Sequence, residues 1–196
     1  LAEPARPHLH RLRVGATTVH VAAFPRASVT AAVVVLPSPE PLPAWCTRTG
    51  IADALVGGFF VTPGGPPLGE VWIGGRRVPT RPFDPAFAAG RSCLHLHGDR
   101  ITIAPLRAFG GAPAGDLLQA GPALVAGGLP LVAEGADPEG FSAGGAQFDS
   151  DITAGRHPRA ALGVAALAFY MNEQMVPAAA KESAAKTTSS GPGPGA

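Results

Sequence analysis

Short apolar runs separated by glycine and proline dominate this chain. Runs such as 31–36 and 129–133 are rich in leucine and valine and are only a few residues long. The sequence contains 26 glycines and 22 prolines, which divide these runs at short intervals. Short apolar runs bounded by turn residues are typical of strands. We therefore predict an α+β fold with strand-rich mixed sheets, few short helices and long Gly/Pro loops.

The N-terminal half shows the pattern most clearly. Residues 12–24 are rich in valine and threonine and predict a strand with a turn at Gly15. Residues 28–36 are apolar on both faces, which predicts a central strand of a sheet. Residues 37–43 contain four prolines and predict an extended loop. Residues 49–56 fit either a short helix or a turn.

Glycine pairs and a Gly-Asp turn predict two hairpins in the middle of the chain. The first joins 70–73 to 76–78 through Gly74-Gly75, and the second joins 95–99 to 100–104. Further strands are expected in the segments that follow, namely 116–121 leading into 122–125, 129–133 after a turn at Gly127-Gly128, and 159–166.

Composition divides the chain into three parts. Residues 1–11 have prolines and histidines with no strand pattern, and we expect a loose N-terminal arm. Residues 12–176 contain the apolar runs and form the predicted domain. Residues 177–196 consist largely of Ala, Lys, Ser, Thr, Gly and Pro, which bury too little apolar area to fold, so we expect a flexible tail.

The charge balance gives no reason to expect a polyanionic partner. Fifteen Lys and Arg oppose 14 Asp and Glu, for a formal net charge of +1. We therefore expect neither nucleic acid nor an anionic membrane surface as a partner. No apolar run reaches the roughly 18 residues of a membrane span. The first residues lack the apolar core of a signal peptide, and the sequence leaves cytoplasmic and exported locations both open.

Cysteine and histidine spacing argues against a metal or cofactor site. Cys46 and Cys93 are the only cysteines and can either form one disulfide or remain free thiols. His95 and His97 share one face of a predicted strand, and His8 and His10 repeat that spacing, yet neither pair has the third ligand of a stable zinc site. We expect these histidines to be structural or on the surface, with no bound metal and no cofactor.

Three segments, in order, carry a family resemblance. They are Asp53-Ala54-Leu55-Val56-Gly57-Gly58-Phe59-Phe60, then Leu118-Gln119-Ala120-Gly121-Pro122-Ala123-Leu124-Val125, then Arg156-His157-Pro158-Arg159-Ala160-Ala161-Leu162-Gly163. Together they resemble the phosphodiester glycosidase family, which includes the enzyme that removes N-acetylglucosamine from phosphodiester-capped mannose. Val56 replaces the family's asparagine, and nothing after Val164 matches its terminal Asp-Gly-Gly-Gly-Ser turn. The resemblance therefore implies a partial hydrolase domain, with bacterial members acting on envelope sugars.

The reaction implied by this resemblance needs a cation and carboxylates. A cation must hold the phosphodiester, and carboxylates must face the sugar ring as it becomes positively charged. Arg159 is our candidate anchor, because a guanidinium binds two oxygens at once; the alternative is a loop-capping role. Asp149 and Asp151 are two apart and share a face of an extended segment, so both are candidates for acid and base roles. Their alternative is a turn or helix cap.

Substrate contacts are expected from the glycine turns and two polar side chains. Gly57, Gly58 and Gly121 would shape the pocket, although each glycine can equally serve a turn. Gln119 would hydrogen-bond a sugar hydroxyl, or else lie at a strand edge facing water. His157 would bind or protonate the leaving phosphate, or else remain an exposed loop residue. The expected ligand is a carbohydrate or sugar phosphate; the rival hypothesis is a non-catalytic carbohydrate-binding or structural remnant of the fold.

Overall fold

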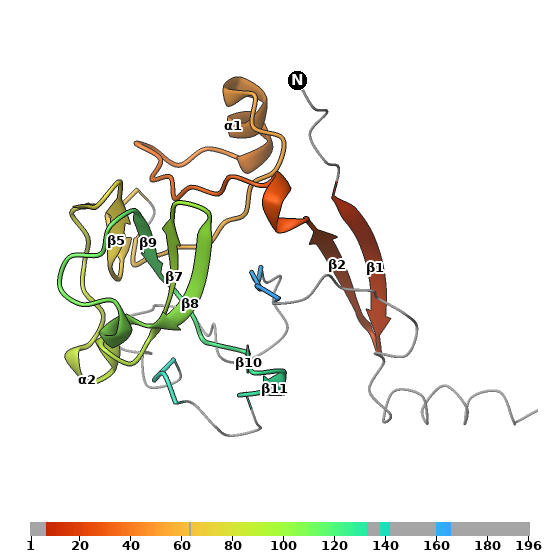
Figure 1. Cartoon of the computed structure of the whole chain (residues 1–196). Coiled ribbons are helices and arrows are strands. Elements are labelled where there is room, and N and C mark those ends of the chain that lie inside the picture. Colours follow the sequence, from red (N-terminus) through yellow and green to blue (C-terminus); the bar gives the residue numbers. More distant parts are fainter. Residues whose placement is uncertain (1–6, 63, 133–137, 142–159, 166–196) are drawn as a thin grey trace, which may run out of the picture. The chain divides into compact units, whose positions relative to one another are not determined.

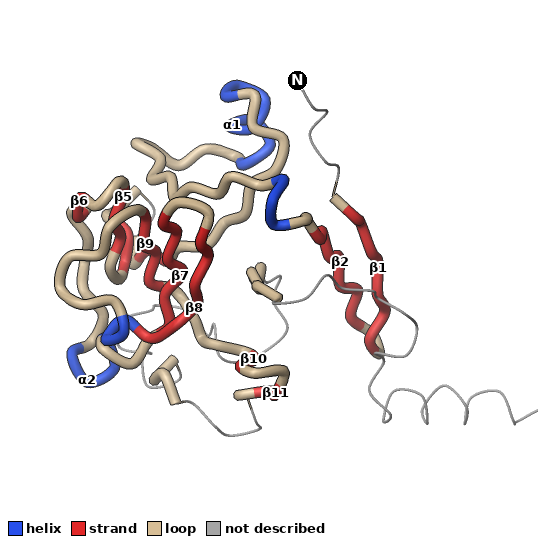
Figure 2. Tube along the Cα trace, in the orientation of Figure 1, coloured by secondary structure: helices blue, strands red, loops and turns tan. Residues whose placement is uncertain are grey.

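The computed structural model describes residues 7–62, 64–132, 138–141 and 160–165 (Figure 1). The chain divides into two compact units, Leu1–Val164 and Ala165–Ala196. The description below concerns the first unit. Its strands form several small sheets, and its helices are short (Figure 2). The prediction of a strand-rich α+β fold with few short helices is confirmed.

A five-stranded antiparallel sheet organises the described fold. Its order is β6-β5-β9-β7-β8, so β9 lies between two strands that precede it in the sequence. The predicted hairpin around Gly74-Gly75 is present as β5–β6, and the one around Gly98-Asp99 as β7–β8. The strand bounds are β5 Val71–Ile73, β6 Arg76–Arg77, β7 Ser92–His97, β8 Arg100–Pro105 and β9 Asp116–Gln119.

One face of this sheet is covered by a segment that we predicted to be a central strand. Residues 29–36 belong to no helix or strand. They follow the 3-10 turn η1 (Arg26–Ser28). Val33 is buried against Val71 and Leu96, and Val35 packs beside it. The prediction of a strand over 28–36 was wrong because the segment lies extended over apolar side chains of the sheet, instead of pairing with a neighbouring strand.

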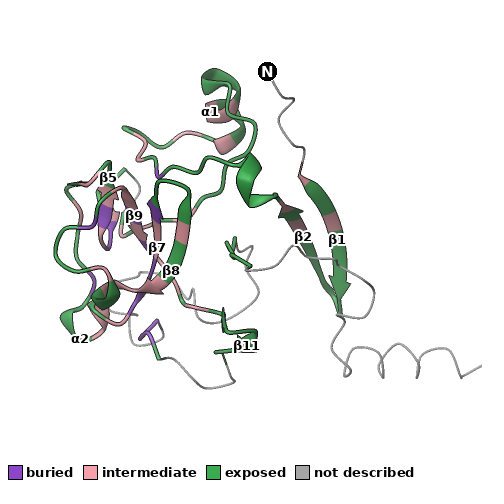
Figure 3. Ribbon diagram, in the orientation of Figure 1, coloured by how far each residue is buried: buried purple, intermediate pink, exposed green. Residues whose placement is uncertain are grey.

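The second core cluster forms around Phe83 and Leu68, which are each 1% exposed. Leu68 belongs to β4 (Pro67–Leu68), which pairs antiparallel with β3 (Phe59–Phe60). Phe59 and Phe83 meet edge to face with ring centroids 6.4 Å apart. Helix α2 (Pro85–Ala88) follows, and its N-cap Asp84 accepts a hydrogen bond from the Ala86 N–H at 2.9 Å. Figure 3 shows the buried segments concentrated in and beside the five-stranded sheet.

The N-terminal region is more regular than predicted. Strand β1 (His8–Val14) pairs antiparallel with β2 (Thr17–Ala23) around Gly15. The expected arm over 1–11 therefore overlaps a strand from His8 onward, and the expected turn at Gly15 separates two strands. The alternation of apolar and polar residues is weak here because every residue of β1 and β2 is at least partly exposed.

The first helix begins within the predicted proline loop. Helix α1 (Leu42–Thr49) has Pro43 in its first turn, where a missing N–H breaks no helical hydrogen bond. It ends at Gly50, whose φ of 71° is left-handed. The predicted loop is therefore present over 37–41, and its last two residues belong to the helix, because proline is tolerated in a first helical turn. Of the helix or turn predicted over 49–56, only Thr49 is helical, and a turn follows at Gly50.

The remaining short elements follow the sheet. The turn at Gly127-Gly128 connects β10 (Val125–Ala126) to β11 (Leu129–Pro130), so the strand expected over 129–133 is shorter than predicted. The 3-10 turn η2 (Leu106–Ala108) follows β8. In the segment predicted as a strand over 159–166, the described residues 160–165 have no strand structure.

Replacing Leu117 by alanine tests whether β9 is the centre of the core. Leu117 is fully buried, at 0% exposed, so Leu117→Ala should lower the free energy of unfolding by about 2–5 kcal/mol. Leu129→Ala, on a side chain that is 70% exposed, should change it by less than about 0.5 kcal/mol. Urea denaturation followed by tryptophan fluorescence measures both. Equal losses for the two variants would contradict this assignment of the core.

Candidate functional site

The predicted site residues fall into two sets. Gly57, Gly58, Gln119 and Gly121 belong to the described part of the chain, and they gather around β9. The predicted catalytic residues Asp149, Asp151 and Arg159, together with His157, lie outside the described residues. The geometry below therefore concerns the glycine turns and the side chains that support them.

The first two segments of the resemblance meet at Leu118. A Cβ built on Gly57 would lie 3.0 Å from the Leu118 side chain, and one on Gly58 would lie 3.8 Å from it. The Gly57 contact is tighter than most side chains tolerate, so glycine there lets the backbone approach β9 closely. Segments far apart in the sequence are thus adjacent in the fold.

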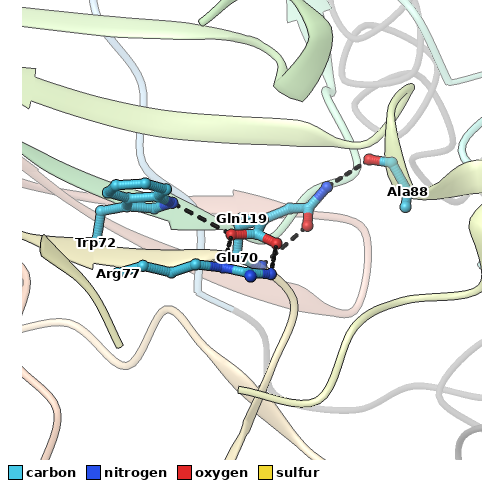
Figure 4. Close-up of polar contacts among 5 residues, drawn as sticks. All are labelled: Glu70, Trp72, Arg77, Ala88 and Gln119. Carbon is cyan, nitrogen blue, oxygen red and sulfur yellow. Dashed lines mark hydrogen bonds and ion pairs between the residues drawn. The ribbon is translucent and has the colours of Figure 1, made fainter. Parts of the chain in front are cut away.

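Gln119 has a structural role. It is 1% exposed, its Oε1 accepts from the Glu70 N–H at 3.0 Å, and its Nε2 donates to the Ala88 carbonyl at 2.6 Å (Figure 4). The amide therefore fixes the start of β5 and the end of α2 to β9. This corrects both of our expectations, since Gln119 neither faces water nor is presented to a sugar hydroxyl. A buried amide satisfies its own hydrogen bonds first.

Glu70 supports the same region from the sheet edge. Its carboxylate accepts from the Trp72 Nε1–H at 3.2 Å and from the Arg77 Nε–H at 2.8 Å, and it forms an ion pair with the Arg77 guanidinium (Figure 4). The hydrogen bond and the charge of Glu70 raise the pKa of Arg77 above its ordinary value. The pair therefore holds the β5–β6 hairpin closed from its exposed side.

A buried carboxylate lies directly beneath the Gly121 turn. Glu139 is 7% exposed and accepts from the Ser92 N–H, the Ser92 Oγ–H and the Ala123 N–H, each at 2.8 Å. Gly121 has a φ of 102°, and a Cβ there would lie 2.5 Å from the Glu139 carboxylate. Two features therefore favour glycine at 121: the positive φ of its backbone and the Glu139 carboxylate oxygen beside it. The peptide bond between Gly121 and Pro122 is cis.

Arg91 positions the residues that present this carboxylate. Its side chain is 0% exposed, and the guanidinium lies between the rings of Phe83 and Phe141, 4.0 Å and 4.2 Å from their centroids. It donates to the backbone carbonyls of Glu139 and Gly140, each at 3.0 Å. Cation–π contacts with two rings and charge-assisted hydrogen bonds to two carbonyls together restrain the guanidinium.

Sequence reasoning missed Arg91 and Glu139. Arg91 follows a glycine in a segment for which we predicted no element, and Glu139 lies in a Pro-Glu-Gly string typical of exposed turns. Neither position has a local pattern that distinguishes a buried charge from an exposed one. Only the long-range packing of Phe83 and Phe141 identifies them.

Both cysteines are free thiols, which decides the alternative left open by the sequence. Cys46 is partly exposed in α1, whereas Cys93 is buried in β7. Burial, followed by the negative charges of Glu139 and Glu70, raises the pKa of the Cys93 thiol to about 12. Cys93 therefore stays protonated at physiological pH and is a poor nucleophile.

The paired histidines take part in packing. The His95 Nε2–H donates to the Ala114 carbonyl at 2.7 Å, and the ring lies 4.9 Å from that of Phe109 and 6.1 Å from that of His97. Among the described residues, no group of three His, Cys, Asp or Glu is placed to bind a metal ion. Within the same ranges, no helix is both long and apolar enough to cross a membrane.

Comparison with protein-family models, with curated proteins and with solved structures finds no match to this chain. The resemblance to phosphodiester glycosidases therefore remains a prediction from three short segments. What the structure adds is the proximity of the first two segments, through Gly57 and Leu118, and the buried support beneath Gly121.

Alanine substitutions at two left-handed glycines separate backbone strain from crowding. Gly121→Ala and Gly128→Ala both place a side chain at a φ beyond the αL region, 102° and 79° respectively, which costs about 1–2 kcal/mol or more. Only position 121 has the Glu139 carboxylate within contact, whereas the space at 128 is open. Gly121→Ala should therefore lose about 1–3 kcal/mol more unfolding free energy than Gly128→Ala. Equal losses in chemical denaturation would show that Glu139 does not occupy the space beside Gly121.

Alkaline titration tests the burial of Cys93. An unfolded thiol loses its proton near pH 8.5, whereas the folded thiol keeps it to about pH 12. Between these values the unfolded state binds fewer protons, so stability falls as pH rises, by at most about 1.4 kcal/mol per pH unit. Cys93→Ala should remove that fall in pH-dependent denaturation. Iodoacetamide at pH 8 should alkylate Cys46 in the native protein and both thiols in urea; rapid native labelling of Cys93 would contradict its burial.

Proposed function

We propose that the chain is a hydrolase-family domain that cleaves a sugar 1-phosphodiester or a related glycosidic bond. The main support is the meeting of two distant glycine segments at β9, since Gly57 packs on Leu118 and Gly121 follows two residues after Gln119. These are the first two segments of the family resemblance. The resemblance implies that these turns shape the substrate pocket, since turn backbone N–H groups can approach the anionic oxygens of a phosphodiester.

The chemistry would divide between charges of opposite sign. Arg159 would bind the phosphodiester through two oxygens, which also stabilises the leaving phosphate. Asp149 or Asp151 would face the ring and stabilise the positive charge that develops at the anomeric carbon. His157 would bind the leaving phosphate or protonate it. These roles rest on the resemblance and on the residue types.

A non-catalytic carbohydrate-binding module is the second candidate. Val56 replaces the polar residue expected before the first glycine pair, and it is 64% exposed. Gln119, our other polar contact, is committed to the backbone of Glu70 and Ala88. A site with these two changes retains its turns and loses two hydrogen-bonding groups. Such a site would bind sugar without reacting with it.

An assay on an α-linked N-acetylglucosamine phosphodiester separates the two functions. The full chain should release free sugar, and Arg159→Ala should lower kcat/KM by about 100-fold or more, because a charged transition-state contact is lost. Arg13→Ala, on the exposed β1–β2 hairpin, is the matched control and should keep the wild-type rate. If Arg159→Ala releases sugar at the wild-type rate, Arg159 takes no part in the reaction.

Binding measurements decide the second candidate. If the wild-type chain releases no sugar, titration calorimetry with sugar phosphates and with neutral oligosaccharides should show heat of binding for a carbohydrate-binding module. No heat with either ligand, from a chain that melts cooperatively, would refute both functions.

A further inference from the structure

We propose that Glu139 is a positioning residue of the proposed site, which holds the turn Gly121-Pro122-Ala123 in its substrate-binding shape. This inference rests on the proposed function, in which that turn meets the sugar phosphodiester. It assigns a role to a buried carboxylate that the family resemblance does not cover. The residues expected to react, Arg159 with Asp149 or Asp151, are different ones, so positioning and chemistry can be tested separately.

The Glu139 carboxylate joins two separate parts of the chain. On one side it accepts from both the backbone N–H and the hydroxyl of Ser92, the first residue of β7. On the other side it accepts from the Ala123 N–H, in the turn that follows β9. Strand β7 is paired with β9 through Cys93 and Gln119, so it is a rigid base. The Glu139 carboxylate thus ties the turn to the first residue of β7.

The burial of the Glu139 carboxylate strengthens its hydrogen bonds to the turn and to β7. A carboxylate that is 7% exposed is stable only when its oxygens accept hydrogen bonds, because water is excluded from them. Three donors at 2.8 Å meet that requirement, and the loss of any one leaves a buried charge less well solvated. The carboxylate therefore has a strong preference for the observed turn over other conformations of residues 121–123.

Arg91 prevents the carboxylate from moving with the turn. It donates hydrogen bonds to the carbonyls of Glu139 and Gly140, so it fixes the backbone of residue 139 itself. The guanidinium is in turn held between Phe83 and Phe141. The turn must adapt to a carboxylate that is fixed in place, which is what pre-organisation of a binding site requires.

Gly121 shows that the turn is adapted to this carboxylate. Any side chain at 121 would begin 2.5 Å from Glu139 Oε2 and would force the two apart. The glycine of the second resemblance segment is therefore explained by the carboxylate beneath it as well as by its backbone conformation. The turn and Glu139 form one unit.

A positioning role and a purely structural role make different kinetic predictions. If the turn only binds substrate, loosening it weakens binding and raises KM, with little effect on the reacting groups and so on kcat. If Glu139 only stabilises the fold, its loss reduces the fraction of folded enzyme. That change lowers the apparent kcat and leaves KM unchanged.

The experiment measures kcat and KM for an α-linked N-acetylglucosamine phosphodiester, below the melting temperature of each variant. Glu139→Gln keeps one acceptor oxygen and turns an amide NH2 toward either the Ser92 N–H or the Ala123 N–H, and it should raise KM about tenfold with kcat within about threefold of wild type. Ser92→Ala removes one hydrogen bond and keeps the charge, so it should raise KM by a smaller factor in the same direction. The control is Glu40→Gln, which alters a surface ion pair with Arg48 and should leave both constants unchanged.

The outcomes distinguish the two proposals. An active wild-type chain whose Glu139→Gln and Ser92→Ala variants keep the wild-type KM overturns the positioning role and leaves the proposed function intact. A wild-type chain that is folded but inactive overturns the proposed function, and the positioning role with it. If Glu139→Gln does not fold, Ser92→Ala alone decides, and an unchanged KM then overturns the positioning role.

Discussion

Strand β9 lies between β5 and β7, and the side chains of Asp116, Leu118 and Gln119 each contact other segments of the chain. The Asp116 carboxylate accepts from the N–H groups of Val33 and Gly74, which attaches the covering segment and the β5–β6 turn. Leu117 fills the core and Leu118 receives Gly57. The Gln119 amide binds Glu70 and Ala88. Four consecutive residues thus bring together segments from most of the described chain, and the glycine turns owe their position to this strand.

Buried polar groups do much of this work because the apolar core is small. Two separate apolar clusters, around Val71 and around Phe83, lie in the described residues. Hydrophobic contacts fix burial but not direction, whereas hydrogen bonds to buried side chains specify one geometry. Gln119 and Glu139 each connect segments that apolar contacts alone would leave free to slide. Arg91 adds the same constraint in a charged form, with two aromatic rings against its guanidinium.

Local sequence patterns predicted those parts of the fold that depend on neighbours in the chain. Gly74-Gly75 and Gly98-Asp99 predicted both hairpins of the main sheet, since a turn residue with positive φ acts locally. The segment over 28–36 was wrongly assigned because an extended apolar run has the same composition whether it pairs or lies across a sheet. For the site, the resemblance selected the two glycine segments that meet at β9. The structural roles of Gln119, Arg91 and Glu139 were not predicted, because their hydrogen-bond partners lie far along the sequence.

The strand order has a consequence for synthesis on the ribosome. Both neighbours of β9 are made before it, so β5 and β7 emerge with the edges that β9 will occupy still unpaired. Each already belongs to a hairpin, β5–β6 or β7–β8, and a two-stranded hairpin alone is marginally stable in water. Unpaired strand edges are templates for pairing with other chains. A nascent chain that has emerged as far as β8 but not β9 therefore carries these two open edges, and they close only when β9 emerges and pairs with them.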